Sequence, residues 1–256
     1  MSLQTSTISV VIPIYNSSKS ILLLYTRVAR VLGELHPQEK KADEILLIDD
    51  FSQDQSFAVI SWLAARDPRV KVVKLKKNLG QHEAIAIGLS LATGSFVVVM
   101  DDDLQDPPEE IHKLYSAIVD VDGCDAVFGQ RKDRRGSWPQ KISSLLFHRS
   151  LKVLFQYQSD PTIACFCILS RRAVQLLNQS DHCMKFCFYK VKTLVPNTKK
   201  LQVAHHQGQR GLGHSSYTTI TRTVLAIKIL GLAMLRKSYK KKRLNLDVYV
   251  EKKINF

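Results

Sequence analysis

The chain has 256 residues, 45% of them apolar, which is enough to bury one large hydrophobic core. No apolar stretch approaches the roughly 18 residues of a membrane-spanning helix, and residues 1–7 lack the basic region of a secretory signal. Of the net charge of +14, a share of +8 lies from Arg222 onward, where ten lysines and arginines accompany two acids; this suits nucleic acid or an anionic membrane surface.

Strand and helix patterns alternate over the first half of the chain. Continuous apolar runs predict strands, and apolar residues at helical spacing predict helices between them. Helices of this length between strands imply right-handed crossovers and a mostly parallel α/β sheet with helices on both faces. The predicted strands are 8–14, 44–48, 70–75, 96–100 and 125–129, and the predicted helices are 24–35, 57–63, 81–92 and 107–118.

The alternation weakens after about residue 130. We expect a charged loop at 132–137, an amphipathic helix at 142–155, an irregular stretch over 160–205 and a basic, glycine-containing stretch at 207–214. The five cysteines are scattered, and their spacings do not match zinc sites. They predict buried, reduced thiols in a cytoplasmic protein.

Polar residues follow each of the first four predicted strands. Ligands of such sheets bind outside the carboxyl ends of the strands, so these residues should converge on one site. They are Tyr15-Asn16, Asp49-Asp50, Asn78 and the pair Asp101 and Asp103.

The acidic run Asp101-Asp102-Asp103-Leu104-Gln105-Asp106 is the strongest chemical signal in the chain. Residues two apart on an extended segment face the same way, so Asp101 and Asp103 can share one cation while Asp102 faces elsewhere. Mg²⁺ and Mn²⁺ take one or two carboxylates together with substrate phosphates. The alternative is a solvated acidic turn closed by Pro107-Pro108, which does not explain the buried strand aimed at it.

Four motifs, in order, resemble the family 2 inverting glycosyltransferases of GT-A fold. The similarity is greatest to the branch that uses polyprenyl phosphate as acceptor: dolichol-phosphate mannose synthases, polyprenyl-phosphate glucosyltransferases and undecaprenyl-phosphate aminoarabinose-type transferases. The motifs are Val11-Ile12-Pro13-Ile14-Tyr15-Asn16, Asp49-Asp50-Phe51-Ser52-Gln53-Asp54, Asn78-Leu79-Gly80-Gln81-His82-Glu83-Ala84 and Asp101-Asp102-Asp103-Leu104-Gln105-Asp106-Pro107-Pro108-Glu109.

The resemblance implies a role for each donor-site residue. Pro13 and Tyr15 would flank the nucleobase, and Asp50 would accept a hydrogen bond from its edge. Asp101 and Asp103, helped by Gln105, would hold Mg²⁺ or Mn²⁺ against the diphosphate of a nucleoside-diphosphate sugar, with UDP expected. Asp103 and Gln105 would thereby serve catalysis, and Asp102 would lie near the ribose or the donor sugar.

The resemblance also implies how an acceptor phosphate is held. Such a phosphate is already ionised and needs positioning more than a base, a task that suits arginine. Arg131, in Gly129-Gln130-Arg131, is the catalytic candidate, with Lys141, Arg134 and Arg135 as substitutes. Arg210, Ser215 and Tyr217 match a segment that closes over the donor phosphates in the family.

The chain departs from the family pattern in two places. Ser17-Ser18 stands where relatives often carry Glu. After Asp160-Pro161-Thr162, the sequence Ala164-Cys165-Phe166-Cys167 lacks the usual Arg, which weakens the inference about what that surface binds. The histidines, His82, His205, His206 and His214, are interpreted as structural residues rather than ligands or bases.

Residues 224–235 are apolar apart from Lys228, and a basic run, 236–243, follows. We expect a catalytic domain at 1–218 and an amphipathic basic segment at 219–256, ending in a polar tail. This segment either lies on an anionic membrane, placing the protein at the inner face of the cell membrane, or packs on the fold.

The favoured function is metal-dependent, inverting transfer of a sugar to polyprenyl phosphate. The alternative keeps the donor but uses a sugar hydroxyl acceptor in surface-polysaccharide assembly. A nucleic-acid-binding protein is disfavoured because the basic cluster holds a single aromatic residue, Tyr239. An inactive sugar-nucleotide binder is disfavoured by the intact acids. The sequence leaves a homo-oligomer open.

Overall fold

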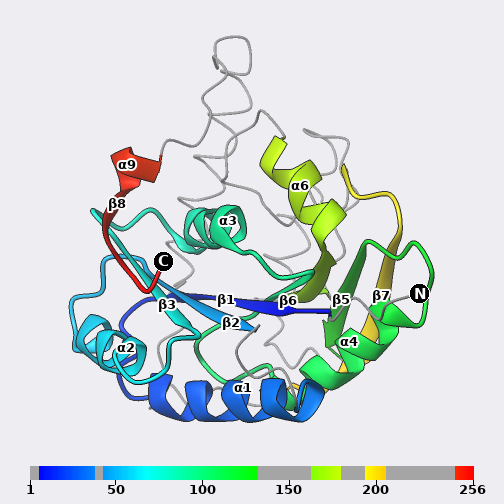
Figure 1. Cartoon of the computed structure of the whole chain (residues 1–256), viewed down its shortest axis with the longest axis horizontal. Helices are drawn as coiled ribbons and strands as arrows, with labels where there is room; N and C mark the ends of the chain where they lie inside the picture. The colour runs from blue at the N-terminus through cyan, green and yellow to red at the C-terminus, as the bar shows by residue number, and fades with distance from the viewer. Residues whose placement is uncertain (1–5, 38–42, 132–162, 180–193, 206–245) are drawn as a thin grey trace, which may run out of the picture.

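The computed structural model describes residues 6–37, 43–131, 163–179, 194–205 and 246–256 (Figure 1). Within these ranges, one eight-stranded sheet with strand order β7-β5-β6-β4-β1-β2-β3-β8 forms the centre of the molecule. Helices α3 and α6 cover one face of this sheet, and α1, α2 and α4 cover the other. The expected α/β architecture with helices on both faces is confirmed.

The described elements begin and end as follows. The strands are β1 Ile8–Ile14, β2 Glu44–Asp49, β3 Val70–Leu75, β4 Phe96–Val99, β5 Ala126–Arg131, β6 Ile163–Ser170, β7 Thr198–Val203 and β8 Val250–Ile254. The helices are α1 Ile21–Leu35, α2 Ser56–Ala64, α3 Gln81–Leu91, the 3₁₀ turn η1 Pro108–Glu110, α4 Ile111–Val119, α6 Arg171–Gln179 and α9 Leu246–Tyr249.

Strands β1 to β4 are mutually parallel, and they define the direction of the sheet. Strand β6 is antiparallel to both β4 and β5, so β5 and its parallel neighbour β7 run the same way as β1. The strands β1 to β5 and β7 therefore all finish at one end of the sheet, which we call the carboxyl end. The opposite end is called the amino end.

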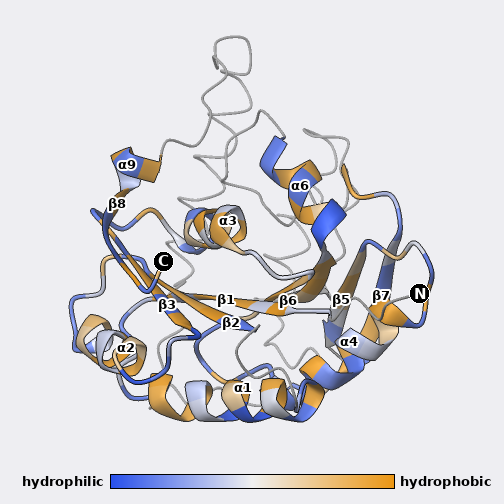
Figure 2. Ribbon diagram, in the orientation of Figure 1, coloured by the Kyte–Doolittle hydropathy of each residue, from blue (hydrophilic) through white to orange (hydrophobic). Residues whose placement is uncertain are grey.

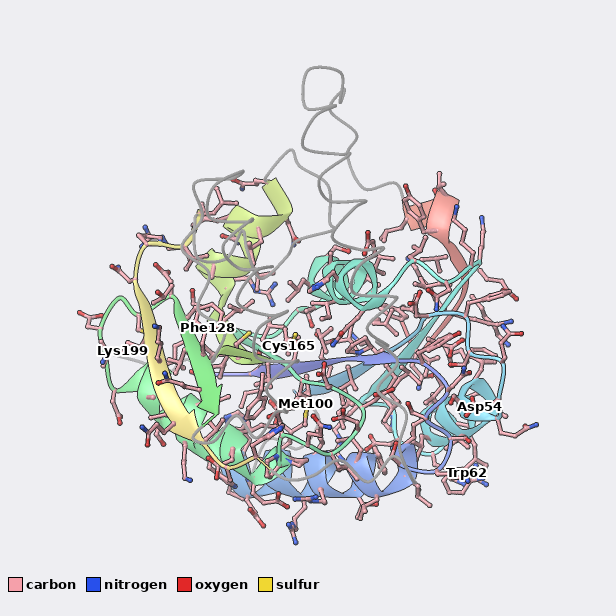
Figure 3. The ribbon with its side chains drawn as sticks, turned by 180° about the vertical axis from the view of Figure 1, so that it is seen from behind. Asp54, Trp62, Met100, Phe128, Cys165 and Lys199 are labelled. Atoms are coloured by element: carbon pink, nitrogen blue, oxygen red, sulfur yellow. The ribbon has the colours of Figure 1, made fainter. Side chains whose placement is uncertain are left out.

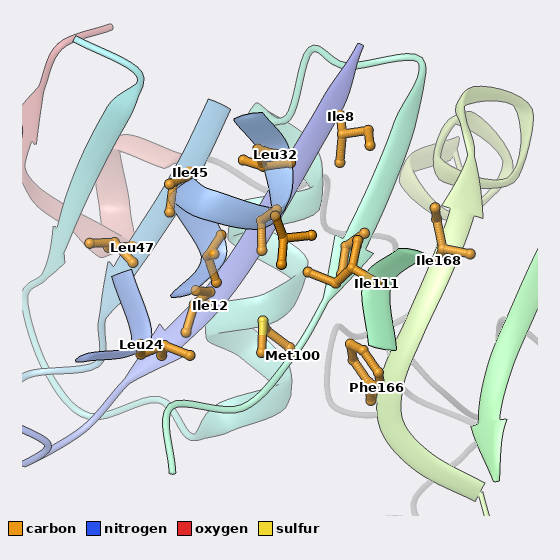
Figure 4. Close-up of a cluster of buried hydrophobic side chains, with 14 of the residues drawn as sticks. Ile8, Ile12, Leu24, Leu32, Ile45, Leu47, Met100, Ile111, Phe166 and Ile168 are labelled. Atoms are coloured by element: carbon orange, nitrogen blue, oxygen red, sulfur yellow. The ribbon is translucent and has the colours of Figure 1, made fainter. Parts of the chain in front are cut away.

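Two apolar layers hold the helices on the sheet. Side chains alternate along a strand, so Val10 and Ile12 face α1 whereas Val11 faces α3. Figure 4 shows the layer beneath α1, where Ile12 and Leu24 pack in the same buried cluster, and the hydropathy colours of Figure 2 place apolar residues along these strands. On the α3 side the approach is close: a Cβ added at Gly88 would lie 2.3 Å from Val11 Cγ1.

The prediction of an irregular stretch over 160–205 was wrong in part. It missed β6, α6 and β7. Strand β6 is inserted between β4 and β5 and buries Phe166, Cys167, Ile168 and Leu169, so it lacks the alternation that marks a half-buried strand. Strand β7 is an edge strand with mostly exposed lysine-rich residues, so it gives almost no apolar signal.

The last residues of the chain join the main sheet. Strand β8 pairs antiparallel with β3, where a polar tail was expected. Asn255 Nδ2 then donates to the carbonyls of Ala64 at 2.6 Å and Val70 at 2.9 Å. Within the described ranges no helix is long and apolar enough to cross a bilayer. Residues 206–245, which include most of the expected basic segment, lie outside the described residues.

Candidate active site

The loops that follow β1, β2, β3 and β4 share an unusual backbone conformation. Each contains one residue with positive φ: Asn16 at 52°, Phe51 at 64°, Gly80 at 96° and Leu104 at 59°. Residues other than glycine adopt positive φ at an energetic cost. They persist where the surrounding structure fixes them, and they cluster at functional sites. The carboxyl end of the sheet is therefore held in a defined, strained shape.

Side chains from other loops hold the turn between β1 and α1. The N–H groups of residues 15–18 each donate to one of them. In chain order, the acceptors are Asp102 Oδ2 at 3.1 Å, Ser52 Oγ at 3.1 Å, Ser56 Oγ at 2.8 Å and Asp54 Oδ2 at 3.1 Å. The second motif, Asp49 to Asp54, thus acts in part as a support for the turn that carries Tyr15. The sequence interpretation missed these roles of Ser52 and Asp54.

Asp50 is buried and supports the turn after β3. Its two carboxylate oxygens accept the N–H groups of Leu79, at 2.7 Å, and Gly80, at 2.8 Å. Burial raises the pKa of Asp50 to about 6, against the lowering effect of these two N–H groups, and the neighbouring Asp49 raises it further. Burial also raises the pKa of Asp49, partly offset by the Ser52 donors. Further hydrogen-bond donors from a ligand would stabilise the ionised form of Asp50.

The three acids after β4 occupy different environments. Asp101 and Asp103 are half-buried, whereas Asp102 is only 3% exposed. Gln81, the first residue of α3, donates to Asp101 Oδ1. The N–H of Gln105 donates to Asp103 Oδ1 at 3.1 Å. The preceding Met100, labelled in Figure 3, is fully buried in the core beneath them.

Two further contacts anchor the same acidic loop, residues 101–110. His205, which follows β7, lies with its Nδ1 3.1 Å from Oδ1 of the buried Asp106. Glu109 accepts Nε of Arg27 at 3.0 Å and Nη2 of Arg30 at 2.6 Å. The Arg27 hydrogen bonds lower the pKa of Glu109 to about 2. Asp106 thus does more than shape a turn, and His205 has a partner in the site that its sequence context did not reveal.

The remaining predicted site residues lie at the same end of the sheet or outside the described ranges. Pro13 is buried in β1, opposite Ile48 of β2, and Tyr15 is 37% exposed. Arg131 ends β5 and pairs in register with Val203, which places its backbone at the carboxyl end. Arg210, Ser215 and Tyr217 lie outside the described residues, as do Lys141, Arg134 and Arg135.

The donor set at this end fits a shared metal site. In the described part of the chain, no three His, Cys, Asp or Glu side chains gather into a site that could hold a metal alone. Two half-buried carboxylates, Asp101 and Asp103, are nevertheless what Mg²⁺ or Mn²⁺ requires when a diphosphate supplies further oxygens. The residues present therefore fit a metal that arrives with an anionic ligand.

The chain belongs to Glycosyl transferase family 2, whose profile matches residues 9–177. It is 34% identical over 220 residues to an undecaprenyl-phosphate 4-deoxy-4-formamido-L-arabinose transferase of Enterobacter sp. (strain 638), covering 82% of this chain and 62% of that protein. The enzyme of the same description from Sodalis glossinidius is 34% identical over 216 residues, covering 82% and 63%. The chain thus spans less than two thirds of the length of these relatives.

Solved structures show the same fold. The Mycobacterium tuberculosis glucosyl-3-phosphoglycerate synthase bound to Mn²⁺, UDP and phosphoglyceric acid superposes with a TM-score of 0.64 at 17% identity, over 91% of this chain and 78% of that one. Mannosyl-3-phosphoglycerate synthase from Rubrobacter xylanophilus gives 0.59 at 17% identity, over 94% and 79%. These matches establish the GT-A-like fold.

Proposed function

We propose that this chain transfers a sugar from a nucleoside-diphosphate donor to a polyprenyl phosphate, with inversion and with the help of Mg²⁺ or Mn²⁺. The observation that carries the proposal is the convergence of Asp101 and Asp103 with Asp50 and Tyr15 at the carboxyl end of the sheet. Family membership and the undecaprenyl-phosphate transferases among the relatives support it.

The donor nucleotide would bind beside the β1 and β2 loops. The exposed ring of Tyr15 and the rigid Pro13 would flank the base, which we take to be uracil. Asp50 would accept a hydrogen bond from the N–H edge of the base. This acceptance needs the ionised carboxylate, and two backbone N–H groups already orient it.

Asp101 and Asp103, with Gln105, would hold Mg²⁺ or Mn²⁺ against the donor diphosphate. A metal so held supplies Lewis-acid stabilisation of the charge that develops on the departing nucleoside diphosphate. The protein's own contribution is orientation: Gln81 fixes Asp101, and the Gln105 N–H fixes Asp103.

Arg131 would position the acceptor phosphate. Its strand ends at the same end of the sheet as β4, and a guanidinium matches the planar geometry of phosphate oxygens. An ionised phosphate oxygen attacks the anomeric carbon as the bond to the nucleoside diphosphate breaks, so no proton needs to be removed from it. Arg210, Ser215 and Tyr217 are proposed, on the resemblance alone, to close over the donor phosphates.

We further propose that the basic residues after 219 hold the protein on the anionic inner face of the cell membrane, where a lipid-linked phosphate is within reach. The charge of this segment supports the idea. We propose a catalytic domain at 1–218 and a basic C-terminal segment at 219–256, of which Leu246, Tyr249 and β8 pack against the core or pair with the main sheet.

The test is incubation of the purified chain with a panel of nucleotide sugars and Mn²⁺, with and without a short-chain polyprenyl phosphate. We expect a lipid-linked sugar from one donor, dependent on the metal. A matched pair of variants controls the site: Asp103→Ala should lower transfer about a thousandfold, and Asp120→Ala, at an exposed acid outside the site, should leave it unchanged. Transfer only to sugar hydroxyl acceptors would support the alternative function, and no transfer from any donor would refute both.

A further inference from the structure

Three hydrogen bonds join Asp102 of the candidate site to one segment of the chain. Its carboxylate Oδ2 accepts the N–H of Tyr15 at 3.1 Å and the hydroxyl of Ser17. Its backbone carbonyl accepts the hydroxyl of Ser20 at 2.9 Å. Side chain and backbone of one residue thus bind the turn that leads from β1 into α1.

We infer that Asp102 is a positioning residue that joins the nucleobase side of the site to the metal side, rather than a contact of the donor sugar. This inference rests on the proposed function and differs from the role that the sequence resemblance implied for Asp102. We call the group of contacts among Asp102, Tyr15, Ser17 and Ser20 the clasp.

Burial and direction support the assignment. Asp102 is 3% exposed and Ser17 is 4% exposed, so the hydrogen bond between them is shielded from water and is stronger for it. Asp102 is buried whereas its neighbours Asp101 and Asp103 are half-buried, so its carboxylate is turned toward the protein interior. A carboxylate that accepts both a hydroxyl and an amide forms charge-assisted hydrogen bonds, which are stronger than neutral ones.

The clasp connects the two halves of the donor site. Tyr15 is the proposed base contact, and Asp101 and Asp103 flank Asp102 in the chain. A donor that spans base and diphosphate needs the base side and the metal side of the site correctly placed relative to each other. Ligand binding that orders one side therefore favours binding at the other. The physical consequence is a coupling between nucleotide binding and metal binding.

The same turn provides a matched control. Ser52 Oγ accepts the N–H of Asn16, the residue after Tyr15, but Ser52 belongs to the β2 loop. Ser52→Ala therefore loosens the turn by one hydrogen bond without disconnecting it from the acidic loop. Asp102→Ala removes both side-chain hydrogen bonds between the turn and the acidic loop, and Ser17→Ala removes one of them, whereas the Ser20 bond to the Asp102 carbonyl remains in both.

The first measurement is UDP affinity by calorimetry, with and without Mn²⁺, for the wild type, the three single variants and the double variant Asp102→Ala/Ser17→Ala. In the wild type we expect Mn²⁺ to tighten UDP binding. Both clasp variants should reduce this enhancement about tenfold, within the usual range of coupling between sites. The double variant should be no worse than Asp102→Ala, and Ser52→Ala should retain the enhancement.

A direct donor contact would give a different pattern. Ser17→Ala would then keep the enhancement, and the effects of the two substitutions would add. A purely structural role would lower the melting temperature of the clasp variants and leave the enhancement intact. Either pattern overturns the inference, and Ser17→Ala keeps it testable if Asp102→Ala does not fold.

The second measurement needs no ligand. Amide hydrogen exchange of residues 15–18 should be faster in Asp102→Ala than in the wild type and unchanged in Asp120→Ala, because the Tyr15 N–H loses its acceptor. Unchanged exchange in Asp102→Ala would overturn the clasp itself. If instead the wild type binds no nucleoside diphosphate with Mn²⁺, the proposed function fails while this measurement still decides whether the clasp exists.

Discussion

The two ends of the sheet both bury acids, but they treat the charge differently. At the amino end, Glu44 accepts Lys71 Nζ at 2.5 Å and the Ser9 hydroxyl at 2.6 Å. Burial raises the pKa of Glu44, but hydrogen bonds from Lys71, Ser9 and the Thr93 N–H outweigh it and hold the pKa below its usual value. The Ser9 hydroxyl in turn accepts the Gly94 N–H at 2.7 Å, so the donors and acceptors of this cluster bind one another.

At the carboxyl end, Asp50 shows the opposite balance. Its hydrogen-bond donors are backbone N–H groups, and its pKa is raised to about 6. The loops around it carry four of the six positive-φ residues of the described chain, whereas Gly123 and Asn255 lie at the amino end. Buried acids alone therefore do not mark a site. A better indicator of a functional site is a buried acid in a strained loop whose neighbours do not offset the cost of ionising it.

The sharpest test of this contrast removes the acid assigned to the metal. We expect Asp103→Ala to lower transfer about a thousandfold, or roughly 4 kcal/mol of transition-state stabilisation, because a metal-binding oxygen is lost. The melting temperature should stay close to that of the wild type, since Asp103 is only half-buried. Steady-state kinetics and thermal unfolding give the two values. Retained metal-dependent turnover would refute the role of Asp103.

The corresponding variant at the amino end is Glu44→Gln. The substitution removes the carboxylate that pairs with Lys71. Because this ion pair is largely buried, the loss should lower the free energy of unfolding by about 3 kcal/mol. Because the pKa of Glu44 is lowered on folding, this contribution is present above the ordinary value of 4.5 and is lost as the pH falls through the folded-state pKa. Denaturant unfolding at several pH values measures it. Weaker binding of UDP or Mn²⁺ in this variant would break the proposed separation of the two ends.

Helix α3 connects the two ends, so a change in its packing should affect both. It begins beside Asp101, at Gln81, and the Thr93 N–H that binds Glu44 follows its end. Gly88→Ala would place a methyl group against Val11 and should cost about 2 kcal/mol of stability through overpacking. We also expect weaker UDP binding, measured by calorimetry. A stable variant with unchanged binding would show that the helix has room to shift.

The smallest expected effect is the pH dependence of nucleotide binding. The free-protein pKa of Asp50 is raised to about 6, and a base N–H would favour the ionised form. Affinity should therefore fall as the pH drops below that value, by at most about tenfold per pH unit. Titrations of the wild type and of Asp50→Asn separate this step from protonation of the nucleotide phosphates. The variant should bind less tightly and lack the Asp50 contribution.

Much of the sheet could be predicted because its central strands are continuous apolar runs. Strands β1 to β4 and the helices between them lie within a few residues of their predicted bounds. The edge strands β7 and β8 could not be predicted, because most of their residues are exposed to solvent and both carry lysines where a core strand carries apolar residues. The order of strands in the sheet depends on long-range pairing that local pattern does not encode.

The site was predictable in its residues and less so in their contacts. The positions of the motifs after the predicted strands placed Asp50, Asp101 and Tyr15 at one end of the sheet, and the parallel strand register confirms this prediction. The support by Ser52, Gln81 and His205 depends on side-chain directions across loops that are distant in sequence. Asp102 shows the same limit, since the sequence indicated that it faces away from its neighbours but not what it faces.

The pairing of β8 with β3 has a consequence for the order of folding. Asn255 binds the carbonyl of Val70 across a separation of 185 residues, whereas β1 to β4 assemble from residues 8–99. Closing so long a loop carries a large entropic cost, and contacts of this separation slow folding. The parallel core can therefore form with the outer edge of β3 unpaired, and we expect β8 to pair with that edge late in folding.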